Sequence, residues 1–323
     1  MRFFRPRALV FSVALGILGL PQPGSTQTAI RAAADAPEKS ETLPALDKRL
    51  MDTTADPCVD FAAYACGNFS KIHPIPQDQP VFDSFVLMIE RTEPELRKLL
   101  ESVAADDAKR SPDNQKIGDF YSTCMDDINF PAGILATPFY DPGATDAENY
   151  GHIGAIVGHE LTHGFDDQGS KFDGDGNLSD WWTPEDEKKF NAMTDCVVQE
   201  YGTFTAIDDA KVNGKLTAGE NAADNGGLRI AFLAFLADAK RKGIDTTAKQ
   251  DGFTPVQQFF LAYGQNWCAE VRPEQVRTQV QTDPHSPDRF RIDGVVQNMQ
   301  EFGQAFGCKS GQPMMPKNAC HVW

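Results

Sequence analysis

The residues best suited to chemistry form an H-E-x-x-H pattern within Gly158-His-Glu-Leu-Thr-His163. The pattern follows an apolar run that suits a buried helix, and residues four apart on a helix lie on one face. His159 and His163 can therefore direct two imidazoles at one ion, and neutral imidazole is a preferred ligand of Zn²⁺. Glu160 lies beside that face, where its carboxylate can act as a base toward water. The pattern predicts a hydrolytic zinc site, although so short a motif also occurs on surface helices with two solvated histidines.

A catalytic zinc site needs a third protein ligand, and an acidic pair downstream offers one. Glu220 and Asp224 are again four residues apart, in a segment with helical spacing. Glu220 can bind the ion, while Asp224 can accept the distal N–H of a ligand histidine and fix its orientation. Taken alone, Glu220 is better explained as an acid that stabilises a helix N-terminus. Together with the upstream motif, the pair predicts one Zn²⁺ ion per chain.

The elements that must position these residues are predicted to be mostly helical. Apolar residues recur at helical spacing in several segments, and convincing strands are few. The predicted helices cover residues 82–103 with a break at Pro94, 114–125, 153–165, 184–204, 219–240, 256–268, 273–280 and 295–306. The predicted fold class is therefore α+β, mostly helical.

Composition excludes several other classes of protein. The 323 residues include 30 Lys and Arg against 46 Asp and Glu, and 41% are hydrophobic, which is ordinary for globular domains. Because Lys and Arg do not cluster, a nucleic-acid partner is not expected. The segment Asp173-Gly-Asp-Gly-Asn177 imitates a calcium loop, but Leu178 and Pro184 stand where an EF-hand needs Gly and Glu.

The N-terminus predicts export. Residues 1–7 carry three Arg and no acid, residues 8–20 are uncharged and mostly apolar, and Pro21 ends the run. A run of 13 residues is short for a membrane span, which needs about 20. Residues 1–26 are therefore predicted to be a signal peptide and residues 27–47 a linker, with no membrane span in the mature chain. The protein would be periplasmic or extracellular, where disulfides between its seven cysteines can persist.

Several motifs together resemble the neprilysin/endothelin-converting-enzyme family of zinc metalloendopeptidases. They are Phe130-Pro-Ala-Gly-Ile-Leu, Asn149-Tyr-Gly, Gly158-His-Glu-Leu-Thr-His-Gly-Phe-Asp-Asp-Gln-Gly169, Asp180-Trp-Trp, Gly219-Glu-Asn-Ala-Ala-Asp-Asn-Gly-Gly227, Gln265-Asn-Trp-Cys268, Thr282-Asp-Pro-His-Ser-Pro287, Phe290-Arg291 and Cys320-His-Val-Trp323. The resemblance covers residues 127–323 and, more weakly, 55–126. It implies a thermolysin-like catalytic domain over 128–323 and a truncated, helical remnant of the N-terminal capping domain over 48–127.

The resemblance also implies a role for individual residues. The implied zinc ligands are His159, His163 and Glu220, with Glu160 as general base and Asp224 as the carboxylate behind a ligand. His285 matches the residue that stabilises the oxyanion of the tetrahedral intermediate, and Arg291 matches the one that binds a substrate carbonyl. Without the family, His285 reads as a loop histidine between two prolines.

Other matches concern the substrate pocket. Ile156, Val157 and Trp267 match part of the wall of an apolar pocket for the residue after the scissile bond, although Ile156 and Val157 alone would be interpreted as core residues. Phe85 is also expected to bind substrate. At Val81 the family has a basic residue that contacts the free carboxylate of the substrate. The chain is therefore not expected to prefer that terminus.

The resemblance pairs six of the cysteines. It implies the disulfides Cys58–Cys308, Cys66–Cys268 and Cys196–Cys320, and it leaves Cys124 without its family partner. From the residues alone, six cysteines allow 15 connectivities, and local pairing stays open.

Family members are much longer, and the expected missing segment falls at about Asp127–Ile128. It would include much of the capping domain and the Asn-Ala-aromatic edge strand that holds the substrate backbone. The prediction is an exported zinc metalloendopeptidase that hydrolyses short peptides through a zinc-activated water, with Glu160 as general base. The alternative is a truncated relative that binds zinc, with or without peptide, but does not turn substrate over. The sequence leaves the oligomeric state open.

Overall fold

The computed structural model describes residues 44–92, 132–173, 176–179 and 181–321, which all belong to one compact unit. The predicted signal peptide, the junction at 127–128 and Cys124 lie outside the described residues, so their assignments stay predictions. The predicted linker reaches too far along the chain. Ala45, Leu46 and Asp47 are buried; the Ala45 carbonyl oxygen lies 2.7 Å from His152 Nε2, and the Asp47 N–H donates to Gln265 Oε1 at 2.9 Å.

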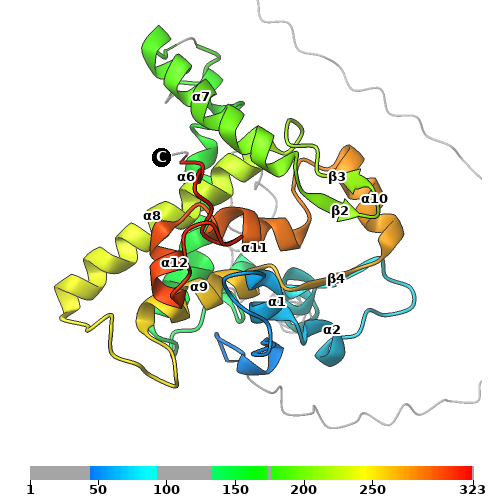
Figure 1. Ribbon diagram of the computed structural model, residues 1–323, viewed down its shortest axis with the longest axis vertical. Coiled ribbons are helices and arrows are strands. Elements are labelled where there is room, and N and C mark those ends of the chain that lie inside the picture. The colour runs from blue at the N-terminus through cyan, green and yellow to red at the C-terminus, as the bar shows by residue number, and fades with distance from the viewer. Residues whose placement is uncertain (1–43, 93–131, 174–175, 180, 322–323) are drawn as a thin grey trace, which may run out of the picture. The chain divides into compact units, whose positions relative to one another are not determined.

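Helices dominate the described chain, as predicted, and the strands are short (Figure 1). The longer helices are α6 (Ala155–His163), α7 (Pro184–Tyr201), α8 (Ala218–Lys242), α9 (Pro255–Asn266), α10 (Pro273–Thr282), α11 (Asp288–Val296) and α12 (Gln300–Phe306). The shorter helical segments are η1 (Lys48–Leu50), α1 (Phe61–Cys66), α2 (Phe69–Ile72), residues 84–92, η2 (Ala132–Leu135), α5 (Asp146–Asn149), η3 (Tyr150–Gly154) and η4 (Gly169–Lys171). The strands are β1 (Val81–Asp83), β2 (Thr205–Ile207), β3 (Ala210–Lys211) and β4 (Ala269–Val271).

Two antiparallel strand pairs join distant parts of the chain. β1 pairs with β4, so that Val81 lies opposite Val271 and Asp83 opposite Ala269. β2 and β3 form a local hairpin. The prediction of a helix from residue 82 is therefore wrong at its start. Asp83 ends the strand, and its carboxylate accepts the Val86 N–H at 2.7 Å, so the helix begins after it.

Two of the other predicted helices begin at capping signals, and the predicted helix over 114–125 lies outside the described residues. Thr183 and Thr254 each accept a backbone N–H three residues on, and a proline follows each of them, so α7 and α9 begin there. The single helix predicted over 295–306 is wrong. Val295 and Val296 end α11, and α12 starts only at Gln300.

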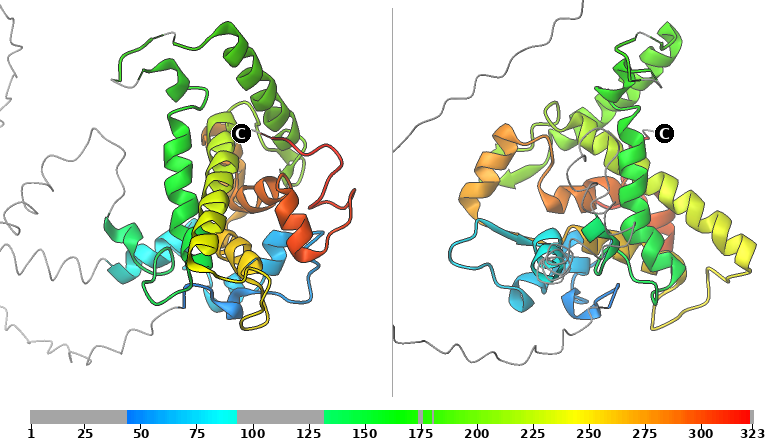
Figure 2. Two further views of the ribbon diagram at one scale, coloured as in Figure 1. Left: turned by 90° about the vertical axis from the view of Figure 1, so that its left-hand side faces the viewer. Right: turned by 180° about the vertical axis from the view of Figure 1, so that it is seen from behind.

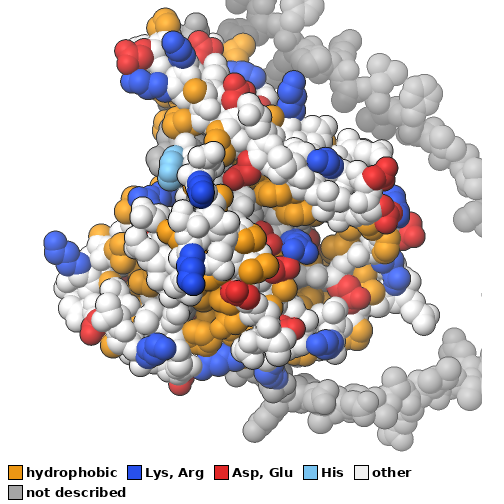
Figure 3. Space-filling model, in the orientation of Figure 1, with side chains coloured by type: hydrophobic (Ala, Val, Ile, Leu, Met, Phe, Trp, Pro, Cys, Tyr) orange, Lys and Arg blue, Asp and Glu red, His pale blue; other side chains and the backbone are white. Residues whose placement is uncertain are grey.

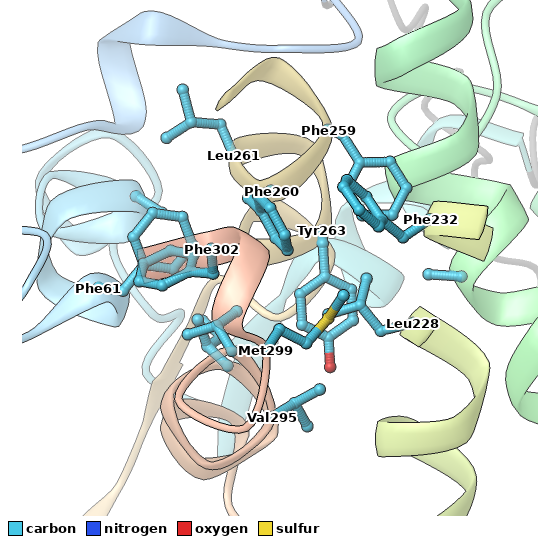
Figure 4. Close-up of a cluster of buried hydrophobic side chains, with 14 of the residues drawn as sticks. Phe61, Leu228, Phe232, Phe259, Phe260, Leu261, Tyr263, Val295, Met299 and Phe302 are labelled. Carbon is cyan, nitrogen blue, oxygen red and sulfur yellow. The ribbon is translucent and has the colours of Figure 1, made fainter. Parts of the chain in front are cut away.

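The main core lies between α8, α9, α11 and α12 (Figure 4). It is built from fully or nearly fully buried rings and aliphatic side chains: Leu228, Phe232, Phe259, Phe260, Leu261, Tyr263, Val295, Met299 and Phe302. Phe61 of α1 joins this core, with its ring centroid 4.7 Å from that of Phe302. The N-terminal segment is therefore an integral part of the core.

Glycines allow α6 and α8 to approach each other closely, and Figure 2 shows the two helices side by side. A Cβ on Gly158 would lie 2.4 Å from the Gly227 carbonyl oxygen, and one on Gly227 would lie 2.3 Å from the His159 nitrogen. Side chains larger than hydrogen cannot occupy this crossing. The contact sets the register between the two helices that carry the predicted ligands.

Three disulfides fasten the N-terminal and C-terminal parts of the described chain to the rest. They join Cys58 to Cys308, Cys66 to Cys268 and Cys196 to Cys320, the pairings that the resemblance implies. Two of them close loops of more than 200 residues, and crosslinks over long loops stabilise a fold by restricting the unfolded chain.

Charged side chains of both signs are interspersed with apolar ones on the face shown in Figure 3. Among the described helices, none combines the length and apolar character needed to cross a membrane.

Candidate active site

Three of the predicted residues converge between α6 and α8. The ligand atoms of His159, His163 and Glu220 all lie within 4.8 Å of one another. The Nε2 atoms of the two histidines are 3.0 Å apart, and Glu220 Oε2 lies 3.3 Å from His159 Nε2 and 3.6 Å from His163 Nε2. The spacing of four residues on α6 and the glycine crossing with α8 together produce this arrangement.

His159 contacts a buried ion pair. The Nδ1 atom of His159 lies 2.8 Å from Asp224 Oδ1, and the side chains of His159 and Asp224 are at least nine-tenths buried. Arg291 of α11 donates to the same carboxylate from Nε and Nη2, each at 2.8 Å. Burial raises the pKa of Asp224, but the charges of Arg291 and His159 outweigh it and hold the pKa well below its usual range. Asp224 is therefore an anion that orients His159.

His163 has a carboxylate of its own. Its Nδ1 lies 2.7 Å from Asp166 Oδ2, in the loop that follows α6. Asp166 Oδ1 accepts the backbone N–H groups of Gln168 at 2.8 Å and Gly169 at 2.7 Å. Burial raises the pKa of Asp166, but these bonds outweigh it, so the pKa lies below the usual value. In both imidazoles, Nδ1 thus lies within hydrogen-bond distance of a carboxylate oxygen, and Nε2 is directed at the cluster.

His285 lies at the edge of the same cluster. Its Nε2 is 3.3 Å from Glu220 Oε2, and its Nδ1 is 2.9 Å from Asp283 Oδ1. The next residue, Ser286, donates to Asn221 Oδ1 at 2.7 Å and so ties this loop to α8. His285 is partly exposed, whereas His159 is buried. The imidazole can therefore meet both the cluster and a ligand arriving from solvent.

Of the predicted substrate-binding residues other than Arg291, Phe85, Ile156 and Trp267 are linked and Val157 is not. The Phe85 ring lies 5.7 Å from Trp267 and 4.6 Å from Phe139, and Phe139 packs with the buried Ile156. Val157 is instead 37% exposed and takes no part in this cluster of buried residues. Successive residues of a helix point about 100° apart, which is why Ile156 and Val157 differ.

Glu160 follows His159 on α6 and is partly exposed. Its position next to a ligand residue, on a helix face that solvent reaches, suits a group that exchanges protons with water or a bound peptide.

The Arg291 guanidinium, which was predicted to bind a substrate carbonyl, already contacts other groups of the protein. Besides its two bonds to Asp224, its guanidinium carbon lies 3.7 Å over the centroid of the Trp267 ring. Its Nη2 is 4.0 Å from Glu220 Oε2, so it borders the cluster as well.

The donor set fits a zinc ion. Tetrahedral Zn²⁺ with bonds of about 2.0–2.1 Å places its ligand atoms about 3.3 Å apart, which matches the three separations given above. Glu220 Oε2 is buried, and the Nε2 atoms of His159, His163 and His285 lie within 3.6 Å of it. Burial lowers the pKa of His159, but Asp224 outweighs it and raises the pKa to about 9, so the site attracts positive charge. Two inward-facing nitrogens and one buried carboxylate oxygen are the contacts that a cation would satisfy.

Sequence reasoning missed two residues around the cluster. Asp166 comes three residues after His163, and Asp283 two residues before His285. An acid within one turn of a candidate ligand histidine is a signal that could have found both.

Comparison with known proteins agrees with this geometry. The sequence models described as peptidase family M13 match residues 57–152 and 119–322. Endothelin-converting enzyme 1 of Bos taurus is 42% identical over 228 residues, which are 68% of this chain and 30% of that protein. Neprilysin-2 of Drosophila melanogaster is 40% identical over 244 residues, 75% of this chain and 32% of that protein.

A solved structure gives the same result. The crystal structure of the zinc metalloprotease ZMP1 of Mycobacterium tuberculosis with an inhibitor superposes with a TM-score of 0.57 and 42% identity, over 60% of this chain and 30% of that one. The chain spans about 30% of the length of the curated relatives that it matches. Since one family model covers well over half of the chain, this chain belongs to peptidase family M13.

Proposed function

We propose that the chain is a zinc-dependent endopeptidase that hydrolyses short peptides. The observation that carries the proposal is the convergence of His159 Nε2, His163 Nε2 and Glu220 Oε2 at the separations of tetrahedral zinc ligands. Family membership supports it, because the relatives named above are endothelin-converting enzyme and neprilysin. The structures of a zinc metalloprotease from the same comparison support the choice of metal.

His159, His163 and Glu220 would hold the ion. Zinc, when bound, would supply Lewis acidity that polarises the scissile carbonyl and makes water more acidic. Asp224 and Asp166 would keep the Nδ1 protons of the two histidines in place, so that both Nε2 lone pairs face inward.

Glu160 would be the general base and then the general acid of the reaction. Its carboxylate would take a proton from the attacking water and later deliver it to the leaving amine, so that one residue serves as base and then as acid. His285 would donate from Nε2 to the oxygen that gains negative charge, and Asp283 would hold the opposite ring nitrogen. Arg291 would bind a substrate carbonyl with an N–H that Asp224 does not use.

The apolar pocket would select the substrate. Phe85, Ile156 and Trp267 form a linked apolar surface beside the cluster, and it suits a large apolar residue after the scissile bond. Val157 would contribute from the exposed side of α6, at the rim.

Cleavage of a quenched-fluorescence peptide library tests the proposal. Oxidised protein loaded with zinc is expected to cleave peptides with a large apolar residue after the scissile bond, and a chelator is expected to stop it. Glu160→Gln keeps the size of the side chain and should lower the rate at least about 10²-fold. Cleavage that survives chelation or this substitution would overturn the proposal.

A second candidate function is zinc binding without turnover, since the chain spans about 30% of the length of its relatives. It predicts folded protein that takes up one zinc ion and cleaves none of the peptides. The two functions therefore separate in a single preparation whose zinc content and activity are both measured.

Export to an oxidising compartment is proposed as well. Three long-range disulfides suit such a compartment. Sequencing the N-terminus of the secreted protein tests it, because signal removal near residue 26 is expected.

A further inference from the structure

A cavity of about 360 Å³ lies between α1, β4, α10 and the start of α11. Its walls include Trp267, Ala269 and Val271 on one side, Val276 of α10, and Asp288 at the start of α11. The cavity is open to solvent and mostly apolar, so it can hold the stem of a long side chain.

The cavity lies next to the metal-binding cluster. Trp267 lines the cavity, and its ring lies 3.7 Å below the guanidinium carbon of Arg291. Arg291 Nη2 is in turn 4.0 Å from Glu220 Oε2. One layer of side chains therefore separates the cavity from the cluster. A peptide held at the cluster would therefore reach the cavity through its solvent-open side.

Small side chains make this space. Ala63 of α1, Ala206 of β2 and Ala269 of β4 all border the cavity. Trp267 and Phe290 are its large aromatic residues. An aliphatic stem can pass the alanines and stack on an aromatic ring, as the side chains of Lys and Arg do.

Charged groups of both signs line the cavity, namely the carboxylates of Asp60 and Asp288 and the guanidinium of Arg289. Asp288 lines the cavity, and burial together with the negative charge of Asp83 and Asp283 raises its pKa to about 7. Asp83 pairs with Ala269 in the β1–β4 register, so both lie on the same face of the sheet. The negative charges near Asp288 thus come from two neighbouring elements, and the positive charge of Arg291 acts in the opposite sense.

The neighbouring arginines are engaged with other acids. Arg289 lies 2.7 Å from Asp60 and 3.5 Å from Asp293. Arg291 makes its two short bonds to Asp224. A cation brought by a ligand would therefore meet Asp288 without displacing these ion pairs.

We propose that this cavity is a subsite for a positively charged side chain of the peptide substrate, with Asp288 as its counter-ion. The inference rests on the proposed peptidase function. It adds a second subsite to the apolar pocket and names the chemical class of substrate residue that this subsite binds. Lys and Arg combine the apolar stem and the charged end that the cavity accommodates. The partner is thus a basic peptide.

Peptide pairs that differ only by arginine or citrulline test this subsite, because citrulline has the same shape without the charge. The pairs are placed at each of the first three positions after the scissile bond, at pH 8. At one position, kcat/KM for the arginine peptide is expected to exceed that for citrulline about tenfold. Asp288→Asn should bring the two peptides to about the same value. Asp245→Asn, which removes an exposed acid after α8, is the matched control and should leave the ratio as in the wild type.

Binding of the same peptides to Glu160→Gln, measured by fluorescence anisotropy, separates this inference from the proposed function. A preference for arginine without turnover in the wild type would overturn the peptidase proposal alone. Equal binding of the two peptides at all three positions, or a preference that survives Asp288→Asn, would overturn the subsite. Val276→Phe narrows the cavity without changing charge and should weaken both peptides, and unchanged binding would also overturn it.

Discussion

The two histidines of the cluster share a ligand arrangement but differ in what supports them. Behind His159 stands an inner arm, made of Asp224 and Arg291 on two separate helices and almost fully buried. Behind His163 stands an outer arm, made of Asp166 and the backbone of the loop at Gln168 and Gly169. The His163 side chain is 30% exposed, and that of His159 is 10% exposed. The contact between Nδ1 and a carboxylate is thus held in place by helix packing in the inner arm and by a loop in the outer arm.

The difference between the two arms indicates which part of the site is the more rigid. The inner arm depends on the α6–α8 crossing and on the core, so changes there affect folding and metal binding together. The outer arm depends on a local turn, so changes there should alter metal binding more than folding.

The largest effect is expected from Gly227→Ala at the base of the inner arm. Its new Cβ would lie 2.3 Å from the His159 backbone nitrogen, and the two helices must separate. We expect destabilisation of at least about 3 kcal/mol and loss of zinc uptake, measured by thermal unfolding and metal analysis. Gly154→Ala is the control, because its Cβ would meet its nearest neighbour at 3.4 Å. Wild-type stability in Gly227→Ala would disprove the close crossing.

The next largest effect is expected from Asp224→Asn. It removes the anion on His159 Nδ1 and leaves the buried Arg291 without its partner. Zinc affinity should fall roughly 100-fold in competition with a chelating dye. An affinity within threefold of the wild type would show that the inner arm does not orient the ligand.

A smaller effect is expected from Asp166→Asn in the outer arm. The asparagine can still accept from the backbone, and His163 is partly exposed, so water can replace part of the lost contact. Zinc affinity should fall about tenfold in the same assay, with little change in the unfolding temperature. If this loss equals or exceeds that of Asp224→Asn, the proposed contrast between the arms is wrong.

A separate effect concerns the pH dependence of stability and the support of the inner arm. Glu200 of α7 accepts from Asn298 at 2.8 Å, and Asn298 also donates to Asn225 of α8. Burial raises the pKa of Glu200 from its ordinary value of 4.5 to about 7. The folded state therefore binds this proton more tightly than the unfolded chain does, and stability falls as the pH rises from about 4.5 through 7.

Glu200→Gln removes the ionisation and should be more stable than the wild type at pH 8, by roughly 2–3 kcal/mol, with no advantage at pH 4.5. Urea unfolding at both pH values measures it. The exposed Glu187→Gln on the same helix is the control. An equal effect of Glu200→Gln at the two pH values would contradict the stated cause.

The sequence predicted those parts of the site whose geometry depends on local spacing. The histidines of α6 and the acids of α8 are four residues apart, and a helix alone places each pair on one face. Which helices cross, and how closely, could not be read in the same way, because Gly158 and Gly227 carry no hydrophobic signal. Asp166 was within reach of sequence reasoning, whereas the stacking of Arg291 on Trp267 requires the tertiary fold.

Two errors in the fold have a common physical reason. α11 was not recognised because Arg291 and Asp293 interrupt its apolar period, yet both are buried, one bonded to Asp224 and the other to the Ala62 N–H. β1 was merged into a helix because three residues are too few to show strand alternation. In both cases tertiary partners outweigh the local pattern.

The measurement that tests the central claim most directly is zinc K-edge X-ray absorption of the oxidised, zinc-loaded protein. Two imidazoles and one carboxylate predict one zinc per chain with nitrogen and oxygen neighbours at about 2.0–2.1 Å and histidine scattering. His163→Ala should remove part of the histidine scattering. A sulfur shell at about 2.3 Å, or protein that folds with its three disulfides but takes up no zinc, would contradict the account.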